Sequence, residues 1–153
     1  MSGYLIFDIG GHELAAPLAE VREVVRIDRL ETLPGLEPPV TGLMQLRGSP
    51  LPVCDLRRTT AGPSTRRDGT EGGDIVLLSM PDGGLLGVAV DRVIAVVSHD
   101  ALVAVEGGAV PIGMPSYMVG VLRHADRTDD AVFLVAMNKL VESLFDDRVP
   151  VAP

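Results

Sequence analysis

The sequence predicts an all-β protein built from two similar sub-barrels. The first reason is an internal repeat, because residues 4–25 can be laid over residues 76–97 without a gap. Identical residues then coincide at Leu5 and Leu77, Gly11 and Gly83, Leu14 and Leu86, Val21 and Val93, Val24 and Val96, and Val25 and Val97. The second reason is order: each copy runs from an apolar segment through a Gly-containing turn to a second apolar segment and then a Val-rich stretch.

The repeat continues further along the chain. Residues 40–43 are echoed by residues 118–121, and residues 55–58 by residues 136–139. With 153 residues, the chain is most simply one compact domain that spans residues 1–153. We expect the first barrel repeat in residues 1–58 and the second, with a C-terminal helix, in residues 74–147. Two packed barrels offer several faces and a groove between them, which suits an adaptor.

The first half reads as short strands. Residues 4–9 end at Gly10-Gly11, a hairpin signal, and residues 13–18 return. Residues 17–26 combine helical spacing with β-branched residues, which predicts a turn of helix that leads into a strand. After a Pro-rich connection at 33–39, residues 40–46 and 51–56 form a second strand pair.

The second half repeats this order after a linker. Residues 59–73 contain no apolar residue larger than Ala or Pro, which predicts a mobile loop. Strands are expected at 75–80, 85–90, 93–97 and 132–137, the last after a polar loop at 123–130. Helical spacing is kept by Met137, Leu140, Val141, Leu144 and Phe145. We therefore expect a final helix that packs across one barrel.

Composition excludes several classes of protein. Hydrophobic residues make up 46% and charged residues 22%, which indicates a folded domain rather than disorder. The apolar runs are too short to span a membrane, and the N-terminus shows no secretion signal. The single cysteine, Cys54, is consistent with a reducing cytoplasm. A net charge of −8 disfavours nucleic acid and anionic lipid as partners.

No catalytic or metal site emerges from the residues. The three histidines, His12, His99 and His124, each lack a second His or Cys at metal-ligand spacing. No glycine-rich segment carries the Lys-Ser/Thr of a phosphate-binding loop, and no Ser lies in a nucleophile elbow. Cys54 is expected to be a small core residue. We predict that the chain is not an enzyme and binds no cofactor or metal.

One run of residues resembles a known family. Residues 42–57 read Gly-Leu-Met-Gln-Leu-Arg-Gly-Ser-Pro-Leu-Pro-Val-Cys-Asp-Leu-Arg. This run is similar to the pattern of the CheW-like coupling proteins of bacterial chemosensory arrays, in which an Asn-x-Arg-Gly turn precedes an apolar-Pro-apolar-apolar-Asp-apolar-Arg strand. Residues 21–24, 87–93, 117–121 and 139–140 agree in order. The resemblance therefore covers nearly the whole chain.

The resemblance implies a fold of two SH3-like five-stranded β-barrels packed around a shared core. It also implies a stand-alone cytoplasmic scaffold without catalytic activity. Its partners would be the regulatory domain of a CheA-type histidine kinase, the cytoplasmic tip of methyl-accepting receptors, and further copies in array rings. The alternative is a small-molecule-binding or enzymatic tandem barrel that shares only the architecture, because fold does not fix function.

The same resemblance suggests where partners bind. The expected kinase-binding residues are Val21, Glu23, Arg47 and Gly48. The expected receptor-binding residues, in a groove between the barrels, are Leu46, Gly87, Val88 and Val93. Two alternatives stay open. One is that Arg47-Gly48 is only a turn with an exposed Arg. The other is that Val21, Val24, Val88 and Val93 are buried core, with Leu86 and Val90 on the same side as Val88.

A few residues call for separate interpretation. Asp55 and Asp91 are expected to be structural, as acceptors of backbone hydrogen bonds at strand ends. Three positions depart from the family pattern. Gln45 stands for its Asn, Pro50 interrupts a strand that usually continues, and Ala136 replaces the Asp that closes the second repeat.

Overall fold

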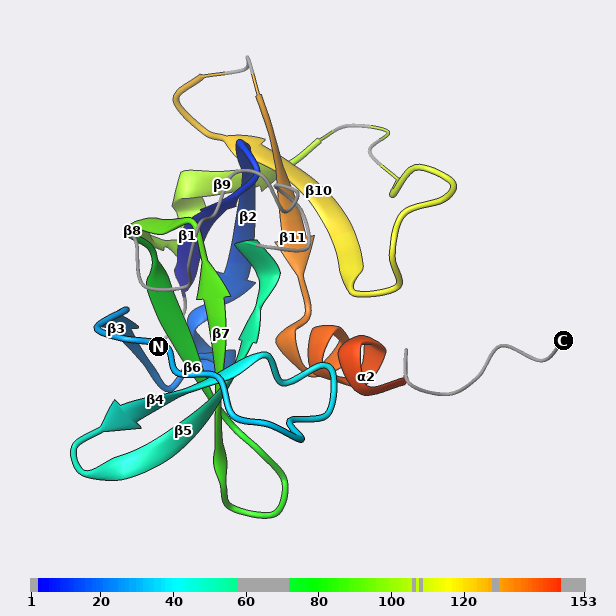
Figure 1. Cartoon of the computed structure of the whole chain (residues 1–153). Coiled ribbons are helices and arrows are strands. Elements are labelled where there is room, and N and C mark those ends of the chain that lie inside the picture. Colours follow the sequence, from blue (N-terminus) through cyan, green and yellow to red (C-terminus); the bar gives the residue numbers. More distant parts are fainter. Residues whose placement is uncertain (1–2, 58–71, 106, 108, 128–129, 147–153) are drawn as a thin grey trace, which may run out of the picture.

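The structure is a computed structural model that describes residues 3–57, 72–105, 107, 109–127 and 130–146. These residues form two curled β-sheets and a C-terminal helix, α2 (Met137–Asp146) (Figure 1). The prediction of an all-β fold with a final helix is confirmed. The predicted loop at 59–73 lies outside the described residues except for its last two glycines.

One sheet has six strands and the other has five. The six-stranded sheet follows the order β8 (Arg92–Ser98), β1 (Gly3–Ile9), β2 (His12–Pro17), β11 (Ala131–Val135), β10 (Met118–His124) and β9 (Leu102–Ala104). The five-stranded sheet follows the order β3 (Glu23–Arg26), β6 (Asp74–Ser79), β7 (Leu85–Val90), β5 (Ser49–Asp55) and β4 (Gly42–Leu46). Two short 3-10 turns, η1 (Leu18–Glu20) and η3 (His99–Ala101), precede β3 and β9. Neither β9 nor β10 was among the predicted strands. The predicted polar loop at 123–130 begins too early, because β10 extends to His124 through its pairing with β9 and β11.

Each sheet takes strands from both halves of the sequence. The hairpin β1–β2 pairs with β8 on one side and with β11 on the other, and the hairpin β6–β7 pairs in the same way with β3 and β5. The expected barrel boundaries, one barrel in 1–58 and one in 74–147, therefore do not match the sheets. A repeat identifies similar segments, but it does not say which copy pairs with which.

The local predictions agree closely with the strands. The expected strand at 85–90 is β7, and the expected turn of helix leading into a strand is η1 followed by β3. The expected strand at 132–137 ends at Val135, because Met137 already begins α2. The two Pro residues of β5 pair with β4 at positions before β5 reaches β7, so neither interrupts the inner ladder.

The apolar residues form three clusters. One fills the five-stranded sheet, one fills the six-stranded sheet, and the largest lies between the two sheets. Along β7, Leu86, Val88 and Val90 point into the central cluster, while Ala89 points into the five-stranded sheet. This strand is buried on both faces, because successive side chains alternate.

The helix α2 closes the central cluster. Its residues Met137, Leu140 and Val141 are buried there with side chains of both sheets. Leu144 and Phe145 pack against the same cluster. The expectation that α2 packs across one barrel is corrected by this observation, since the helix covers the core that both sheets share.

Candidate functional site

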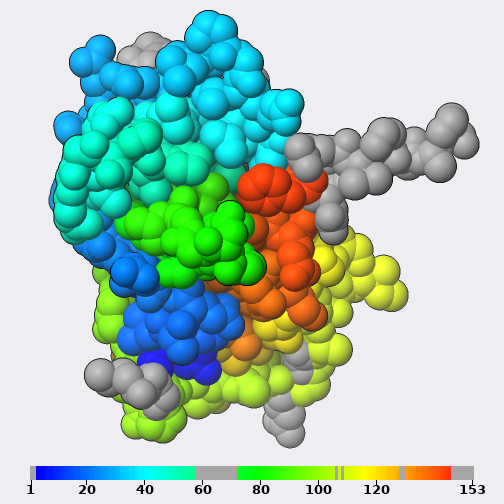
Figure 2. All heavy atoms as spheres, turned by 90° about the horizontal axis from the view of Figure 1, so that it is seen from below, coloured from blue at the N-terminus to red at the C-terminus, as the bar shows by residue number. Residues whose placement is uncertain are grey.

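A groove of about 820 Å³ opens beside α2, where the two sheets meet. One wall is the segment 19–22 from η1 to the start of β3, the second is the end of β6 with residues 80–81, and the third is α2. These three segments come together on one face of the molecule (Figure 2). The groove therefore depends on pieces of chain that are far apart in sequence.

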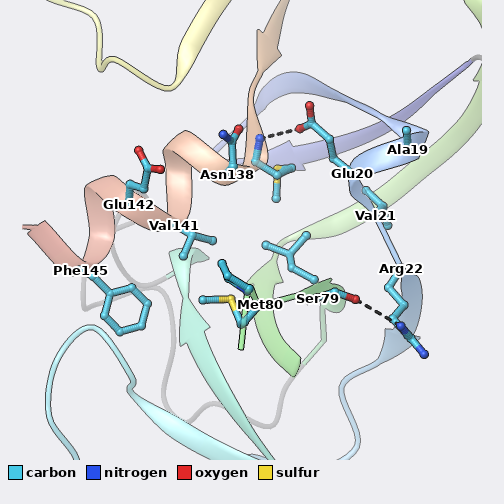
Figure 3. Close-up of a pocket in the computed structure, with 13 residues that line it drawn as sticks. Ala19, Glu20, Val21, Arg22, Ser79, Met80, Asn138, Val141, Glu142 and Phe145 are labelled. Carbon is cyan, nitrogen blue, oxygen red and sulfur yellow. Dashed lines mark hydrogen bonds between the residues drawn. The ribbon is translucent and has the colours of Figure 1, made fainter. Parts of the chain in front are cut away.

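The groove has an apolar lining and a polar rim. The apolar lining includes Val21, Leu78, Met80, Val141 and Phe145, and the polar rim includes Glu20, Arg22, Ser79, Asn138 and Glu142. Val141 and Phe145 of α2 point toward Met80 of the facing wall, whereas the carboxylate of Glu142 points outward (Figure 3). A concave apolar surface with a few polar groups at its edge is typical of a binding site.

A second exposed feature lies at the β4–β5 turn. Arg47 and Gly48 form a two-residue turn with φ values of 51° and 84°. Positive φ at both central residues is the geometry of a tight hairpin turn that follows strand twist, and glycine favours it at the second position. The turn projects Arg47, whose side chain is 66% exposed.

Arg47 pairs with Glu23 of β3. Both terminal nitrogens of the guanidinium donate to the carboxylate, Nη1 to Oε1 at 3.4 Å and Nη2 to Oε2. The hydrogen bond from Arg47 holds the pKa of Glu23 below its usual value of 4.5, and the pKa of Arg47 is raised in turn. The pair joins the turn to an edge strand at the surface, where it stays open to solvent.

The segment around β3 links these two features. Arg22 lines the groove, where its Nη1 donates to Ser79 Oγ at 3.3 Å, while the next residue, Glu23, pairs with Arg47. Neighbouring residues of an extended chain point to opposite sides, so one short segment carries both features.

Comparison with known proteins decides the family. Residues 3–145 match the CheW-like domain. The chain belongs to the CheW-like family. Members of this family are non-enzymatic chemotaxis adaptors, and this membership confirms the prediction that the chain is not an enzyme.

Two individual proteins are similar to this CheW-like chain. A chemotaxis protein CheW from Bacillus subtilis (strain 168) is 33% identical over 54 residues, which is 35% of each chain. The crystal structure of the scaffolding protein TtCheW from Thermoanaerobacter tengcongensis superposes with a TM-score of 0.64 at 18% identity and covers 88% of both chains. The first match spans about a third of its relative, and the second shows the shared fold.

The structure brings together part of the predicted kinase-binding set. Glu23 and Arg47 form the ion pair, and Gly48 completes the turn that presents it. Val21 is half-buried and lines the groove instead. The alternative, in which Arg47-Gly48 is only a turn with an exposed Arg, does not account for the ion pair between Arg47 and Glu23.

The predicted receptor-binding residues do not converge, and none of them lines the groove. Val88 is completely buried in the central cluster, so the expectation that it faces a groove is wrong, and the core alternative holds. Gly87 is also buried, and a Cβ there would lie 2.8 Å from Ile75 Cγ2. Leu46 and Val93 are half-buried against different clusters, and their contact with a receptor stays a prediction.

Asp55 and Asp91 have the structural roles that were expected. Asp55 Oδ1 accepts from the backbone N of Arg57 at 3.0 Å, and Asp91 Oδ2 accepts from the backbone N of Gly10 at 2.7 Å. Asp55 also holds the side chain of Arg57, which is completely buried. Sequence reasoning treated Arg57 only as part of a motif and did not predict its burial.

The described residues contain no group of three or more His, Cys, Asp or Glu side chains that could hold a metal ion. His124 is engaged elsewhere, with Nε2 2.7 Å from Glu13 Oε1. Within the same residues, no helix is long and apolar enough to cross a membrane.

Sequence reasoning missed most of the groove. No place in a binding groove was predicted for Met80 or Glu20, because each lies at the end of a predicted element and carries no motif. The helical spacing of Val141 and Phe145 was the available signal. It identified an apolar face, but not the part of that face which lies open beside β6.

Proposed function

We propose that this chain is a cytoplasmic adaptor that couples methyl-accepting chemoreceptors to a CheA-type histidine kinase. The observation that carries the proposal is the match of residues 3–145 to the CheW-like domain. An adaptor needs separate surfaces for its partners, and the groove and the Arg47–Glu23 pair supply two.

The kinase regulatory domain is assigned to the surface around the ion pair. Exposed charges at a rim steer encounter and set specificity more than they add affinity. The two-residue turn at Arg47-Gly48 carries one charge, and β3 carries the other. Recognition of the paired charges therefore requires β3 and the β4–β5 turn to keep their relative positions.

The receptor tip is assigned to the groove. A receptor tip is a helical hairpin, and a helix binds an apolar groove through a few anchoring side chains. Met80 offers such anchors a flexible thioether side chain, and Phe145 offers them a flat aromatic ring. Glu142 on α2 and Arg22 across from it would favour a helix whose apolar stripe is flanked by charges of opposite sign.

The groove does not support the enzymatic alternative. A catalytic pocket gathers polar residues whose pKa values are displaced. Among the described residues, the displaced values belong to Glu23, Arg47, Cys54 and Asp100, which do not line the groove. Self-association in array rings stays a prediction that no observation favours over the two-partner role.

Binding of purified protein to two fragments tests the proposal. The fragments are the regulatory domain of the cognate CheA-type kinase and a receptor-tip hairpin, each measured by calorimetry with micromolar dissociation constants expected. Met80→Glu should weaken hairpin binding about tenfold or more and leave kinase binding intact, because it places a charge among the anchors. Val119→Glu is the matched control, since Val119 is exposed and lies outside the groove. Failure of the wild-type chain to bind either fragment at about 100 μM would contradict the proposal.

A further inference from the structure

Glu20 connects two walls of the groove. Its Oε1 accepts a hydrogen bond from the backbone N of Met137, the first residue of α2, at 2.8 Å. The two residues are 117 positions apart in sequence. Figure 3 shows the bond at the end of the groove where α2 begins. The contact thus ties the segment before β3 directly to the helix.

This bond supplies a cap that the helix lacks locally. The first backbone N–H groups of a helix have no partner within the helix, and a side chain at the preceding position usually accepts from one of them. The preceding residue here is Ala136, which has no side-chain acceptor, and the first turn of α2 contains no acidic residue. A carboxylate at this end also interacts favourably with the helix dipole.

The internal repeat shows that the residue which accepts from the helix start differs between the two halves of the chain. Residues 136–139 correspond to residues 55–58, so Ala136 occupies the place of Asp55. Asp55 accepts a hydrogen bond from the backbone N of Arg57, two residues further along its own segment, where residues 56–57 are helical. In the second half the acceptor comes from Glu20, on another wall of the groove. A local cap stabilises a helix end, whereas a distant one also fixes where that end lies.

We propose that Glu20 is a positioning residue that sets the distance between α2 and the segment before β3, and so the width of the groove. The inference rests on the proposed receptor site. The β3 side is itself fixed to β6, since Arg22 N donates to Leu77 O at 2.8 Å and Arg22 Nη1 donates to Ser79 Oγ. Loss of the Glu20 bond therefore releases the start of α2 relative to a fixed frame.

Three variants of the full chain distinguish two roles of Glu20: a tether, which holds α2 at a fixed distance from the segment before β3, and a cap, which only stabilises the start of the helix. The variants are Glu20→Ala, Glu20→Gln, and the double variant Glu20→Ala with Ala136→Asp. The readouts are hydrogen exchange of the Met137 and Asn138 amides, affinity for the receptor-tip hairpin, and affinity for the kinase regulatory domain. Glu20→Ala should speed exchange roughly fivefold, as expected for a lost cap. It should weaken hairpin binding by a similar factor and leave kinase binding unchanged. Because Glu20 also lies on the rim of the groove, Glu20→Gln shows whether its charge rather than its hydrogen bond matters for hairpin binding.

The other two variants decide between the interpretations. Glu20→Gln keeps an acceptor and should behave like the wild type. The double variant should restore slow exchange of the Asn138 amide, because Asn138 corresponds to Arg57, whose backbone N donates to Asp55 in the first half, but it should not regain hairpin affinity. Recovery of both would show that Glu20 is only a cap and would overturn the inference.

The inference and the receptor site can fail separately. Unchanged hairpin affinity in Glu20→Ala, with the wild type binding, overturns the inference and leaves the receptor site standing. Absence of hairpin binding by the wild type overturns the receptor site, and the inference with it. If Glu20→Ala does not fold, the double variant carries the same test, since it lacks the tether and keeps a capped helix.

Discussion

Arg47 in the β4–β5 turn and Glu23 on β3 form an exposed ion pair that bridges the two edge strands of the five-stranded sheet. These strands lie at opposite ends of the strand order, β3-β6-β7-β5-β4. Their contact through one pair of side chains shows that the sheet curls until its edges approach. Formation of the pair therefore depends on the curled shape of the sheet. The pair is also a candidate contact for a partner.

The carboxyl of Glu23 should titrate below its usual value of 4.5, because the Arg47 hydrogen bond favours the charged form. A folded-state pKa below that of the unfolded chain means that the stabilisation is present above the unfolded pKa. It is lost as the pH falls through the folded pKa. Carboxyl NMR titration measures the midpoint directly. In Arg47→Ala the midpoint should rise toward 4.5, and an identical midpoint in both proteins would show that the pair does not form in solution.

Charge reversal by Arg47→Glu should impair kinase binding, because it places a like charge beside Glu23 at the proposed contact. Thermal unfolding should shift by no more than about 2 °C, since exposed charges contribute little to stability. Arg92→Glu is the matched control, because the Arg92 side chain is 67% exposed, faces an aspartate, Asp8, and lies on β8 of the other sheet. A Tm far below that of the control would mean that Arg47 is chiefly structural.

A lysine at Val88 should unfold the protein. Val88 is 0% exposed in the central cluster, and burial of an unpaired ammonium is destabilising by roughly 3 kcal/mol or more. Val96→Lys makes the same chemical change on β8 at a residue that is 62% exposed, and it should fold normally. Circular dichroism melts compare the two. A folded Val88→Lys protein that had lost only receptor binding would restore the groove placement that the structure rejects.

Removal of the buried guanidinium by Arg57→Ala should be far more destabilising than removal of the exposed one by Arg47→Ala. Arg57 makes two side-chain bonds to Asp55, each of 3.0 Å, and its Nη1 donates to Gly72 O. Loss of one partner leaves the Asp55 carboxylate buried, at a cost of about 3–5 kcal/mol. Urea unfolding of both variants checks this difference. If the two variants lose the same free energy of unfolding, water must replace the missing guanidinium of Arg57.

Cys54 should be inert in the folded protein. Burial raises the pKa of its thiol to about 11, so little reactive thiolate exists at neutral pH. Ellman's reagent at pH 8 should react only after denaturant is added. The pKa of Cys54 in the folded protein lies above the usual value of 9.0, so the free energy of unfolding should decline as the pH rises from about 9 to 11. In the Cys54→Ala variant this decline should be smaller. Rapid labelling of the native protein would contradict this placement.

Local sequence patterns determined most of the secondary structure of this protein. Alternation, Gly-containing turns and helical spacing identified the main strands, the turn of helix before β3 and the helix α2, because these depend on neighbouring residues. The order of short motifs along the chain indicated the CheW-like family, to which residues 3–145 belong. The turn at Arg47-Gly48 was also readable, since glycine at the second position suits its positive φ.

Only the tertiary structure decided which segments meet. Strand exchange between the halves depends on long-range pairing, to which both copies of a repeat are equally suited. Val88 could not be oriented from sequence, because a strand buried on both faces is apolar at every position and loses its period of two. The bond from Glu20 to Met137 carries no local signal at all, since the acceptor and the donor are brought together by the packing of α2 against both sheets.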